Sequence, residues 1–545
     1  MLLQTAPYMP HEVTEVLVLL AMCVPRARWC LQSDDVPKSR RQAPDGESTV
    51  AFQVVLPALG SATVTIDTAA AQPAQPAGVA VASKRPNVAA DYVLENENVK
   101  LSFSRVTGRL DAWVNKASNV TASIDQSFCY YLSSLGGKGS TQPSGAYIFR
   151  PESQICYPVH PFLSKTITIE TVEKGGVVQE IRQHFAPWLT QTVRLAAGNR
   201  HATFEFTVGE VPLTELSSNT TAAGAAPAGK PAPTPVKLFH GHEIVSRFSS
   251  SIASNGELLT DSNGREMMLR KRNYRPTWKL NQTEPVAGNY FPCNGAVAIK
   301  DDKVQLTVLV DSSQGVASIN DGEIEIMVHR RLTVDDHRGV GEPLDEREFV
   351  TTYVSKGEHG RHYGPGLIVR GRHSVLLEPV ATAAQVWRPL MDRIFGTPKL
   401  SFSTDAAVAA RTHPSFSALA KPLPPNVQLM TLKAMAPGVI LLRLAHQFAI
   451  SEDPTLSAPV MVDLSTLFSK AAGIAIINVT EVSLTANMDK AAIMRKRALA
   501  AAWPTVDTGA RPHPWRSAPP LDFATDPMVK LGPMEIKTFK IACRQ

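Results

Sequence analysis

The stretch HRRLTVDDHRGVGEP, residues 329–343, places three arginines, two histidines and two adjacent aspartates close together in the chain. Paired carboxylates can divide the acid and base roles of glycoside hydrolysis, but there the two groups converge on one bond from about 5 Å apart or more. Asp335 and Asp336 are neighbours on a chain that runs directly out of a predicted strand, so their side chains diverge. A hydrolytic pair is therefore the least favoured interpretation.

Two other interpretations of this stretch remain open. Aspartates commonly fix turns through local hydrogen bonds, so the charged groups could form a carboxylate–guanidinium network that pins a turn. Alternatively, an arginine fork could hold the hydroxyl groups of a ligand or orient a neighbouring catalytic carboxylate. Arg338 is the candidate for that second role. Arg330 and Arg331 should point to opposite sides of the strand before the turn.

A second cluster of possible ligands is HGHE, which contains His240, His242 and Glu243. Two histidines two residues apart on a strand share a face, but no third zinc ligand is evident beside them. We expect a solvated strand start there rather than a metal site, and the same holds for His359 and His362 in a glycine-bounded loop. The sequence contains no GxSxG elbow, phosphate-binding glycine loop or HExxH helix.

The segments around the charged stretch alternate apolar and polar residues with a period of two. The pattern occurs at residues 201–208, 303–310 and 322–329. It predicts strands with one face in water. Turn sequences such as those at 261–264 and 320–323 follow at short intervals, as in antiparallel sandwiches. With only one clear helix, at 489–502, the fold is expected to be mostly β, built from packed sheets.

Composition bounds the class of protein. The 545 residues are 44% hydrophobic, enough for a large core, and at about 100 to 200 residues per domain they predict two to four domains. The net charge of +6 comes from basic residues scattered along the chain, which argues against a nucleic-acid partner. The apolar run Val16 to Val24 is shorter than the roughly 20 residues that cross a bilayer, and no lysine or arginine precedes it as in a signal peptide. We interpret it as a buried strand and expect no membrane partner.

Two segments differ in composition from the rest. Residues 69–90 and 222–236 are rich in Ala, Pro and Gly and hold almost no large apolar side chain, so neither can bury enough surface to fold alone. We expect the first to be a linker and the second to be a disordered loop inserted in a β domain. The six cysteines have no zinc-ligand spacing and leave room for one or two disulfides.

Longer motifs carry a resemblance to a known family. They are TDSNGREMMLRKRNYRPTW (260–278), TEPVAGNYFPCN (283–294), DSSQGVASINDGEIEIMVHRRLTVDDHRGVGEPLDE (311–346), LPPNVQLMTLK (423–433) and GPMEIKTF (532–539). In this order they resemble the C-terminal half of the class II α-mannosidases, glycoside hydrolase family 38, and most closely its lysosomal branch. With PALG at 57–60 marking the start of that half, the resemblance covers nearly the whole chain from about residue 50.

The resemblance implies a fold and a set of domains. It predicts a large antiparallel β super-sandwich of the galactose mutarotase-like type, followed by a smaller C-terminal β-sandwich. We expect these over residues 91–415 and 416–545, with residues 1–68 as the remnant of a small β module with an atypical N-terminus. The first 45 residues match the family poorly, as a misassigned gene start would produce.

The resemblance also implies chemistry: a retaining hydrolase that removes terminal α-linked mannose from N-glycan-derived oligosaccharides in an acidic compartment. In the family, histidines and aspartates of an N-terminal α/β domain hold a zinc ion, and one of these aspartates is the nucleophile. The zinc-binding His-x-Asp-x-Gly-Trp motif has no counterpart in this sequence. We therefore expect no catalytic residue, no metal ligand and no bound zinc in this chain, and no hydrolysis by the chain alone.

By the same match, the Asp-Asp-x-Arg-Gly segment borders the sugar-binding cleft. Its residues are Asp335, Asp336, Arg338 and Gly339. Arg338 would contact substrate hydroxyls or the catalytic carboxylates. NYFPCN, residues 289–294, is expected to be structural, with Tyr290 as a sugar-stacking ring the lesser alternative. The opening stretch is thus interpreted as a clamp on the sugar side of an active site.

Three functional hypotheses follow. In the first, the chain is the C-terminal β region of a lysosomal-type α-mannosidase, and its partners are a mannose-containing oligosaccharide and an N-terminal catalytic half, if that half is encoded separately. In the others, it is a free-standing carbohydrate-binding β protein, or a truncated gene product with exposed apolar surface where a catalytic half would dock. Four Asn-x-Ser/Thr sequons suit the lysosomal or secretory location that the resemblance implies.

Overall fold

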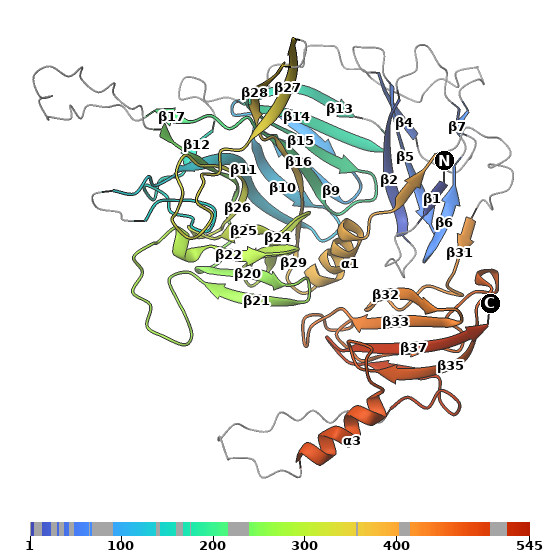
Figure 1. Cartoon of the computed structure of the whole chain (residues 1–545). Helices are drawn as coiled ribbons and strands as arrows, with labels where there is room; N and C mark the ends of the chain where they lie inside the picture. Colours follow the sequence, from blue (N-terminus) through green and yellow to red (C-terminus); the bar gives the residue numbers. More distant parts are fainter. Residues whose placement is uncertain are drawn as a thin grey trace, which may run out of the picture. The chain divides into compact units, whose positions relative to one another are not determined.

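The computed structural model divides the chain into two compact units (Figure 1). The described residues are 2–4, 13–22, 30–31, 38–42, 48–64, 66–67, 91–137, 142–159, 167–174, 176–215, 239–355, 358–402, 415–501 and 520–544. One unit, which we call the large sandwich, comprises Val79–Lys174 and Val178–Val380. The other comprises Met1–Gly78, Gly175–Val177 and Ala381–Gln545.

The large sandwich is built from two nine-stranded antiparallel sheets. The first has the order β22-β25-β26-β19-β11-β10-β9-β8, with β12 on β11: β8 (Tyr92–Glu95), β9 (Val99–Phe103), β10 (Leu110–Asn115), β11 (Val120–Leu132), β12 (Tyr157–Pro158), β19 (His242–Ser250), β22 (Phe291–Cys293), β25 (Gln314–Ala317) and β26 (Glu323–Arg331). The second has the order β13-β14-β15-β16-β29-β24-β23-β20-β21: β13 (Thr168–Lys174), β14 (Val178–Ala186), β15 (Leu189–Ala196), β16 (Ala202–Val208), β20 (Glu257–Ser262), β21 (Glu266–Lys271), β23 (Ala296–Lys300), β24 (Val304–Val310) and β29 (Val369–Pro379). Smaller elements of this unit are β17 (Thr214–Glu215), β18 (Phe239–His240), η1 (Ala287–Asn289), β27 (Arg347–Ser355) and β28 (Glu358–Gly366).

The core of the large sandwich joins side chains from both sheets. Trp113 and Phe248 of the first sheet and Phe204 of the second belong to one buried cluster. The rings of Phe204 and Phe248 meet edge to face with centroids 5.5 Å apart, an arrangement that aromatic pairs favour. The expectation of a mostly β fold with packed antiparallel sheets is therefore confirmed.

β16 follows the predicted alternation, β24 does not, and β26 follows it in part. In β16, every second residue from Ala202 to Val208 is buried. Every residue of β24 after Val304 is buried, so the wet face predicted for that strand is wrong; in β26 the exception is Glu325, whose carboxylate is buried. Gln305 of β24 donates to Thr307 Oγ1 at 2.9 Å, which shows that the alternating polar groups bond inside the protein instead of to water.

The predicted turns connect strands as expected. Asn263 and Gly264 have φ of 52° and 70° in the tight connection from β20 to β21, a conformation that asparagine and glycine adopt readily. Gly322, with φ of 74°, leads from β25 into β26. A Cβ at that glycine would lie 2.4 Å from the carbonyl oxygen of Ser250, so only glycine fits there.

The second unit contains a smaller C-terminal sandwich. Its elements are β1 (Leu2–Gln4), β2 (Val13–Met22), β3 (Cys30–Leu31), β4 (Lys38–Gln42), β5 (Ser48–Leu56), β6 (Gly60–Thr63), β7 (Ile66–Asp67), α1 (Ala383–Phe395), β30 (Lys399–Ser401), β31 (Ser415–Ser417), β32 (Val427–Ala436), β33 (Val439–His446), β34 (Val460–Asp463), η2 (Lys470–Ala472), β35 (Ala475–Val482), α3 (Lys490–Ala501), β36 (Met528–Leu531) and β37 (Ile536–Arg544). The sheet β32-β33-β37-β35 contributes Leu442 and Phe539, and the pair β34-β36 contributes Val462 and Leu531, to one buried cluster. The smaller sandwich predicted by the resemblance is thus confirmed.

The helices show where sequence patterns succeed and fail. α3 confirms the predicted helix, and β2 confirms a strand over most of the apolar run at 16–24. α1 was not predicted, and it contains Pro389. Arg388 of α1 is buried, stacks on Trp387 with 4.4 Å from its guanidinium carbon to the ring centroid, and pairs with Glu452 at 2.7 Å. None of the described helices is long and apolar enough to span a membrane.

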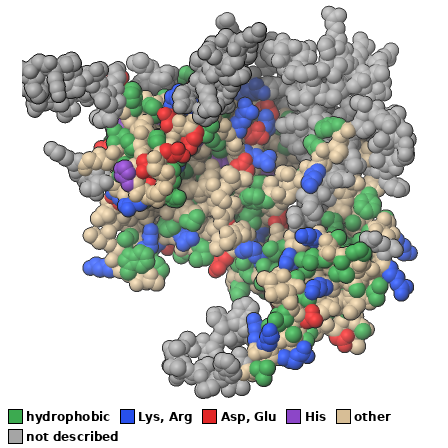
Figure 2. Space-filling model, in the orientation of Figure 1, with side chains coloured by type: hydrophobic (Ala, Val, Ile, Leu, Met, Phe, Trp, Pro, Cys, Tyr) green, Lys and Arg blue, Asp and Glu red, His purple; other side chains and the backbone are tan. Residues whose placement is uncertain are grey.

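Two expectations lie outside the described residues: the linker at 69–90 and the inserted loop at 222–236. The domain limits predicted at residues 68, 91 and 416 stay predictions. On the face drawn in Figure 2, lysine and arginine side chains of the described residues are dispersed and interspersed with apolar and acidic ones.

Candidate functional site

The charged stretch leaves the first sheet at the end of β26 and forms a turn anchored by Asp336. This side chain is 1% exposed, and its Oδ2 accepts hydrogen bonds from the backbone N–H groups of Tyr147 at 2.6 Å and Ile148 at 2.9 Å. Its Oδ1 accepts from the N–H of Arg338 at 3.0 Å. Both carboxylate oxygens are therefore engaged, and the carboxylate ties the turn to segment 142–150.

The protonation state of Asp336 fits this anchoring role. Burial by itself favours the neutral acid, but the three backbone N–H donors outweigh that effect and lower the pKa of Asp336 below its ordinary value. Gly145 on the facing segment is required by the close approach, because a Cβ there would lie 2.5 Å from the backbone nitrogen of Asp336. Asp336 thus acts as a charged staple between two loops.

Asp335 shapes the turn on its exposed side. Its Oδ2 accepts from the N–H of His337 at 3.0 Å, and its Oδ1 accepts from the N–H of Gly341 at 3.3 Å. His337 has a positive φ of 60°, and Gly339 has 117°, a value that favours glycine. The two aspartates bond to different groups and do not converge on a common point.

Arg338 is the exposed member of the turn. Its Nη2 donates to Oε1 of Gln142, whose own Nε2 donates to the carbonyl oxygen of Asp336 at 2.9 Å. The guanidinium is therefore held beside the loop that Asp336 anchors, and the residue is exposed. Neither Arg338 nor Gly339 lines the large cavity described next.

That cavity, which we call the aromatic cleft, has a volume of about 670 Å³. It is lined by Tyr147–Arg150, Glu284, Ala287, Gly288, Tyr290–Asn294, Ser313–Gly315 and Met327. Phe149 and Tyr290 meet edge to face with centroids 5.0 Å apart, and Arg150 pairs with Glu284 at 2.6 Å. Because Tyr147 and Ile148 belong to its wall, the Asp336 staple holds one side of the cleft.

The other arginines of the stretch are structural, and they point to opposite sides as predicted. Arg330 pairs with the buried Glu243, with 3.0 Å between Nη2 and Oε1, and donates to the carbonyl oxygen of Gly145 at 3.0 Å. Arg331 is itself buried and pairs with Asp345 at 2.7 Å. The carboxylate–guanidinium interpretation therefore describes the base of the turn.

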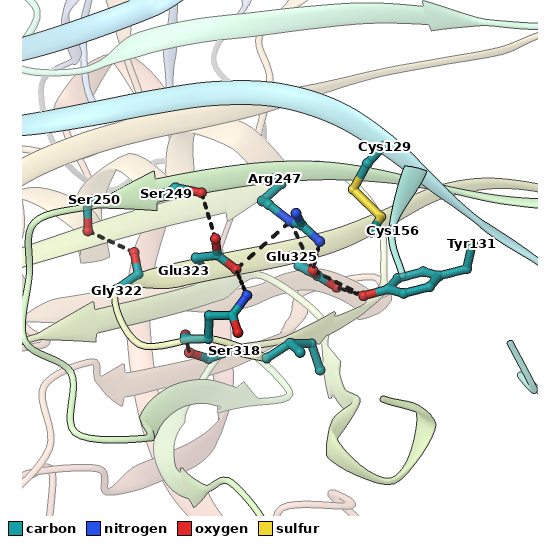
Figure 3. A network of polar contacts seen from close by, with 12 residues as sticks. Cys129, Tyr131, Cys156, Arg247, Ser249, Ser250, Ser318, Gly322, Glu323 and Glu325 are labelled. Carbon is teal, nitrogen blue, oxygen red and sulfur yellow. Dashed lines mark hydrogen bonds and ion pairs between the residues drawn. A yellow bond between two sulfur atoms is a disulfide. The ribbon is translucent and has the colours of Figure 1, made fainter. Parts of the chain in front are cut away.

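A buried carboxylate lies behind the cleft. Glu325 of β26 is fully buried and accepts from Tyr290 at 2.8 Å and Tyr131 at 3.1 Å. Arg247 of β19 donates to it through Nε at 3.0 Å and Nη2 at 2.5 Å (Figure 3). Burial, and after it the charge of Glu325, raises the pKa of both tyrosines, so each phenol stays a hydrogen-bond donor. The disulfide Cys129–Cys156 lies beside this network and joins β11 to segment 142–159.

The HGHE cluster is not a solvated strand start, which corrects that expectation. His242 is 3% exposed and Glu243 is fully buried. The ring of His242 stacks on Tyr130 with centroids 4.2 Å apart, and its Nε2 lies 2.8 Å from Thr214 Oγ1. Burial lowers the pKa of His242 to about 4, so the ring is neutral near pH 7. His359 and His362 lie in strand β28, which pairs with β27, so the glycine-bounded loop expected there is wrong; their side chains lie outside the described part.

The described residues do not provide a zinc site. In their ranges, no three His, Cys, Asp or Glu side chains come together as a possible metal centre. A zinc site in proteins takes three or four such ligands, so the metal implied by the resemblance does not fit the residues placed here. We derive no step through a metal in this chain.

Sequence reasoning missed most of the cleft. Tyr147, Arg150 and Glu284 line it but lie far from the charged stretch in the sequence. The segment SGAYIFR at 144–150, with two aromatic residues and an arginine between small ones, was the available signal. Tyr290, the lesser alternative as a sugar-stacking ring, belongs to the lining of the cleft.

The sequence of this chain is similar to that of known proteins. The family profile described as "Glycosyl hydrolases family 38 C-terminal domain" matches residues 94–338, a range that includes the Asp336 staple and Arg338. The chain is 41% identical over 455 residues to "Lysosomal alpha-mannosidase" of Bos taurus, covering 82% of this chain and 40% of that protein. It is 38% identical over 510 residues to the protein of the same name from Homo sapiens, covering 92% of this chain and 44% of that protein.

The fold is shared with a solved structure. An alpha-mannosidase from Enterococcus faecalis V583 covers 99% of this chain with a TM-score of 0.52 at 11% sequence identity, and the match covers 55% of that chain. The chain spans less than half the length of the two curated relatives. Over that span the motifs, the sandwich fold and the family profile agree, and residues 94–338 match the C-terminal domain of glycosyl hydrolase family 38.

Proposed function

We propose that this chain forms the β-rich C-terminal part of an α-mannosidase and borders the site where terminal α-D-mannose is removed from oligosaccharides. The identity of 41% over 455 residues to a protein named lysosomal alpha-mannosidase carries the proposal. The same relatives support a lysosomal or secretory location. The mannose-containing glycan is the substrate class that follows.

In this proposal, Arg338 is the clamp on the sugar side. Its guanidinium is exposed and has donors left after the bond to Gln142, so it can donate to sugar hydroxyls or to a catalytic carboxylate. Asp336 is a positioning residue, since both oxygens of its carboxylate accept hydrogen bonds from backbone N–H groups. Asp335 and Gly339 give the turn its shape and so set where the guanidinium lies.

The aromatic cleft supplies the wall beside that clamp. Ligand sites commonly have volumes of about 300 to 1,000 Å³ and combine apolar lining with a few polar groups, as this cleft does. The hydroxyl of Tyr290 donates to Glu325, which fixes the position of this residue in the lining of the cleft. We propose that an apolar face of a sugar ring packs there.

The bond-breaking groups belong elsewhere in this proposal. The described residues hold no cluster able to bind a catalytic metal, and Asp335 and Asp336 are used by the turn. A nucleophile and its metal must then come from residues that are not placed here. By itself, the chain of 545 residues is expected to hold sugar without hydrolysing it.

Two measurements test the proposal. An aryl α-mannoside is offered to the chain at acid pH with zinc, first alone and then together with the N-terminal half of a family relative. We expect turnover only in the mixture. Turnover by the chain alone would contradict the proposal, and mannose binding with no activity in the mixture would favour a free-standing carbohydrate-binding protein.

A further inference from the structure

A second cavity of the large sandwich has a different chemistry from the aromatic cleft. We call it the arginine pocket; its volume is about 420 Å³. Its polar lining consists of Tyr131, Gln154, Arg247, Arg272, Asn273 and Asn320. No carboxylate of the described residues lines it, whereas two guanidinium groups do. Figure 3 shows the Arg247 side of this region, next to the disulfide Cys129–Cys156.

Arg272 contributes an uncompensated charge. Its Nη1 donates to the carbonyl oxygens of Ser318 at 3.2 Å and Ile319 at 2.9 Å, which fixes the side chain in the wall. None of the carboxylates in the described ranges forms an ion pair with it. The charge of Arg272 also helps to lower the pKa of Asp321, but it is the smallest of the causes, and the hydrogen bond from the backbone N–H of Gly256 is the largest. The positive charge of Arg272 is therefore available to a ligand.

Arg247 and two amides add hydrogen-bond donors. Arg247 uses Nε and Nη2 on Glu325, and its Nη1 has no hydrogen bond to the described part of the chain. The Oδ1 of Asn273 accepts from Asn289 at 2.8 Å, which leaves its Nδ2 for the pocket. Gln154 is exposed at the pocket and bonds to none of the described groups. Donors thus outnumber acceptors along the lining.

We propose that the arginine pocket binds a small ligand that carries an oxyanion, of the size of a monosaccharide bearing a phosphate, sulfate or carboxylate group. A pocket with one unpaired guanidinium, further N–H donors and no carboxylate matches the acceptor-rich, negative surface of such groups. Its volume lies in the usual range of about 300 to 1,000 Å³ for small-molecule sites. This inference is independent of mannoside hydrolysis.

Titration calorimetry of the full chain with a hexose 6-phosphate, a hexuronic acid, inorganic phosphate and the neutral hexose tests the proposal. We expect the charged probes to bind at the pocket and the neutral hexose to bind there at least about tenfold more weakly, because it lacks the charge-assisted contact to Arg272. Absence of binding by all charged probes, or equal binding of the neutral hexose, would overturn it. The ranking among the charged probes identifies the oxyanion.

Variants locate the binding. Arg272→Gln should weaken it about tenfold or more, and Arg272→Lys should keep part of it, because lysine retains the charge but loses the planar fork. Lys271→Gln is the matched control: it removes the same charge from the neighbouring residue, which is exposed and pairs weakly with Glu257 at 3.5 Å. An equal loss in Lys271→Gln would mean that general surface charge binds the anion, and the proposal would fail.

A second pair of variants changes a residue of the pocket lining without removing a guanidinium group. Gln154 can be changed without breaking a hydrogen bond to the described residues. Gln154→Glu should weaken binding several-fold and Gln154→Lys should strengthen it several-fold, because each places a charge at the cavity. Unchanged affinity in both variants would show that the anion binds elsewhere.

Discussion

The aromatic cleft and the arginine pocket are two cavities of one sandwich that meet at a single carboxylate. Tyr290 from the cleft and Tyr131 and Arg247 from the pocket all donate to Glu325. The cleft owes its wall to a loop that Asp336 holds by backbone hydrogen bonds, whereas the pocket combines Tyr131 of β11 and Arg247 of β19 with side chains from several connecting segments. An adjacent-residue motif thus shapes a loop, while the charges around a ligand-sized cavity come from distant parts of the chain.

The largest effect is expected where the two cavities meet. Glu325→Gln removes the countercharge of the partly buried Arg247, and breaking a buried ion pair from one side typically costs about 3–5 kcal/mol. Thermal denaturation should therefore show a large fall in Tm. Glu323→Gln is the control, because Glu323 is 4.0 Å from Arg247 and also accepts from Ser249 at 3.0 Å. Equal small shifts for the two variants would show that Glu325 is not the shared support.

The disulfide should matter to both cavities. It anchors segment 142–159, which supplies Ile148 to the cleft and Gln154 to the pocket. Replacing Cys129 and Cys156 by alanine should destabilise the unit by about 2–4 kcal/mol, the usual effect of losing a disulfide of this loop length. Limited proteolysis should then cleave this segment first. Reductant should change the Tm of the parent and leave the double variant unaffected; a reductant effect on both would contradict this account.

Acid should act more on the cleft than on the pocket. Burial lowers the pKa of His373 to about 3, and this ring lies 3.0 Å from Gln314 of the cleft wall. Its folded pKa is below the unfolded value of about 6.5, so its contribution is complete above pH 6.5 and is lost as the pH falls toward 3, at roughly 1.4 kcal/mol per pH unit. His242, with a pKa of about 4, acts in the same direction.

The measurement is Tm between pH 7 and pH 5 for the parent and for His373→Gln. The variant cannot take up the proton, so its Tm should depend less on pH. His337→Gln serves as the control, because the side chain of His337 is 80% exposed. If His373→Gln keeps the full pH dependence of the parent, the buried ring is not its source.

A smaller effect is expected at the staple. Asp336→Asn keeps one acceptor oxygen but cannot accept from all three backbone N–H groups, and an unsatisfied buried group costs about 1–3 kcal/mol. Hydrogen exchange at the amides of Tyr147 and Ile148 should accelerate. Asp335→Asn, on the exposed side of the turn, should leave those two amides protected. Equal protection in both variants would rule out the staple.

Sequence alone could predict the parts of the fold that depend on local patterns. The alternation at 202–208 and the glycine turn at Gly322 correspond to β16 and the entry to β26. The alternating pattern of β26 predicts that Glu325 faces water, because the pattern does not reveal a partner such as Arg247 that stabilises a buried carboxylate. α1 was missed because Pro389 normally argues against a helix.

The site was predictable only in part, because its contacts are long-range. The turn function of Asp336 could be proposed from its residue type, but its partners Tyr147 and Ile148 are 189 and 188 residues away in the sequence. The pocket around Arg272 has no sequence motif, since it depends on which loops the two sheets bring together. Long-range pairing of this kind needs the folded structure.

The most direct test of the account is the kcat/KM of Arg338 variants in the mixture of this chain with a family N-terminal half. Arg338 is exposed, so Arg338→Ala should change the free energy of unfolding by no more than about 0.5 kcal/mol and leave Tm nearly unchanged. It should lower kcat/KM for an aryl α-mannoside by roughly 10- to 100-fold, the loss of one charge-assisted contact, and Arg338→Lys should recover part of it. Full activity in Arg338→Ala would contradict the claim that this sandwich supplies the clamp on the sugar.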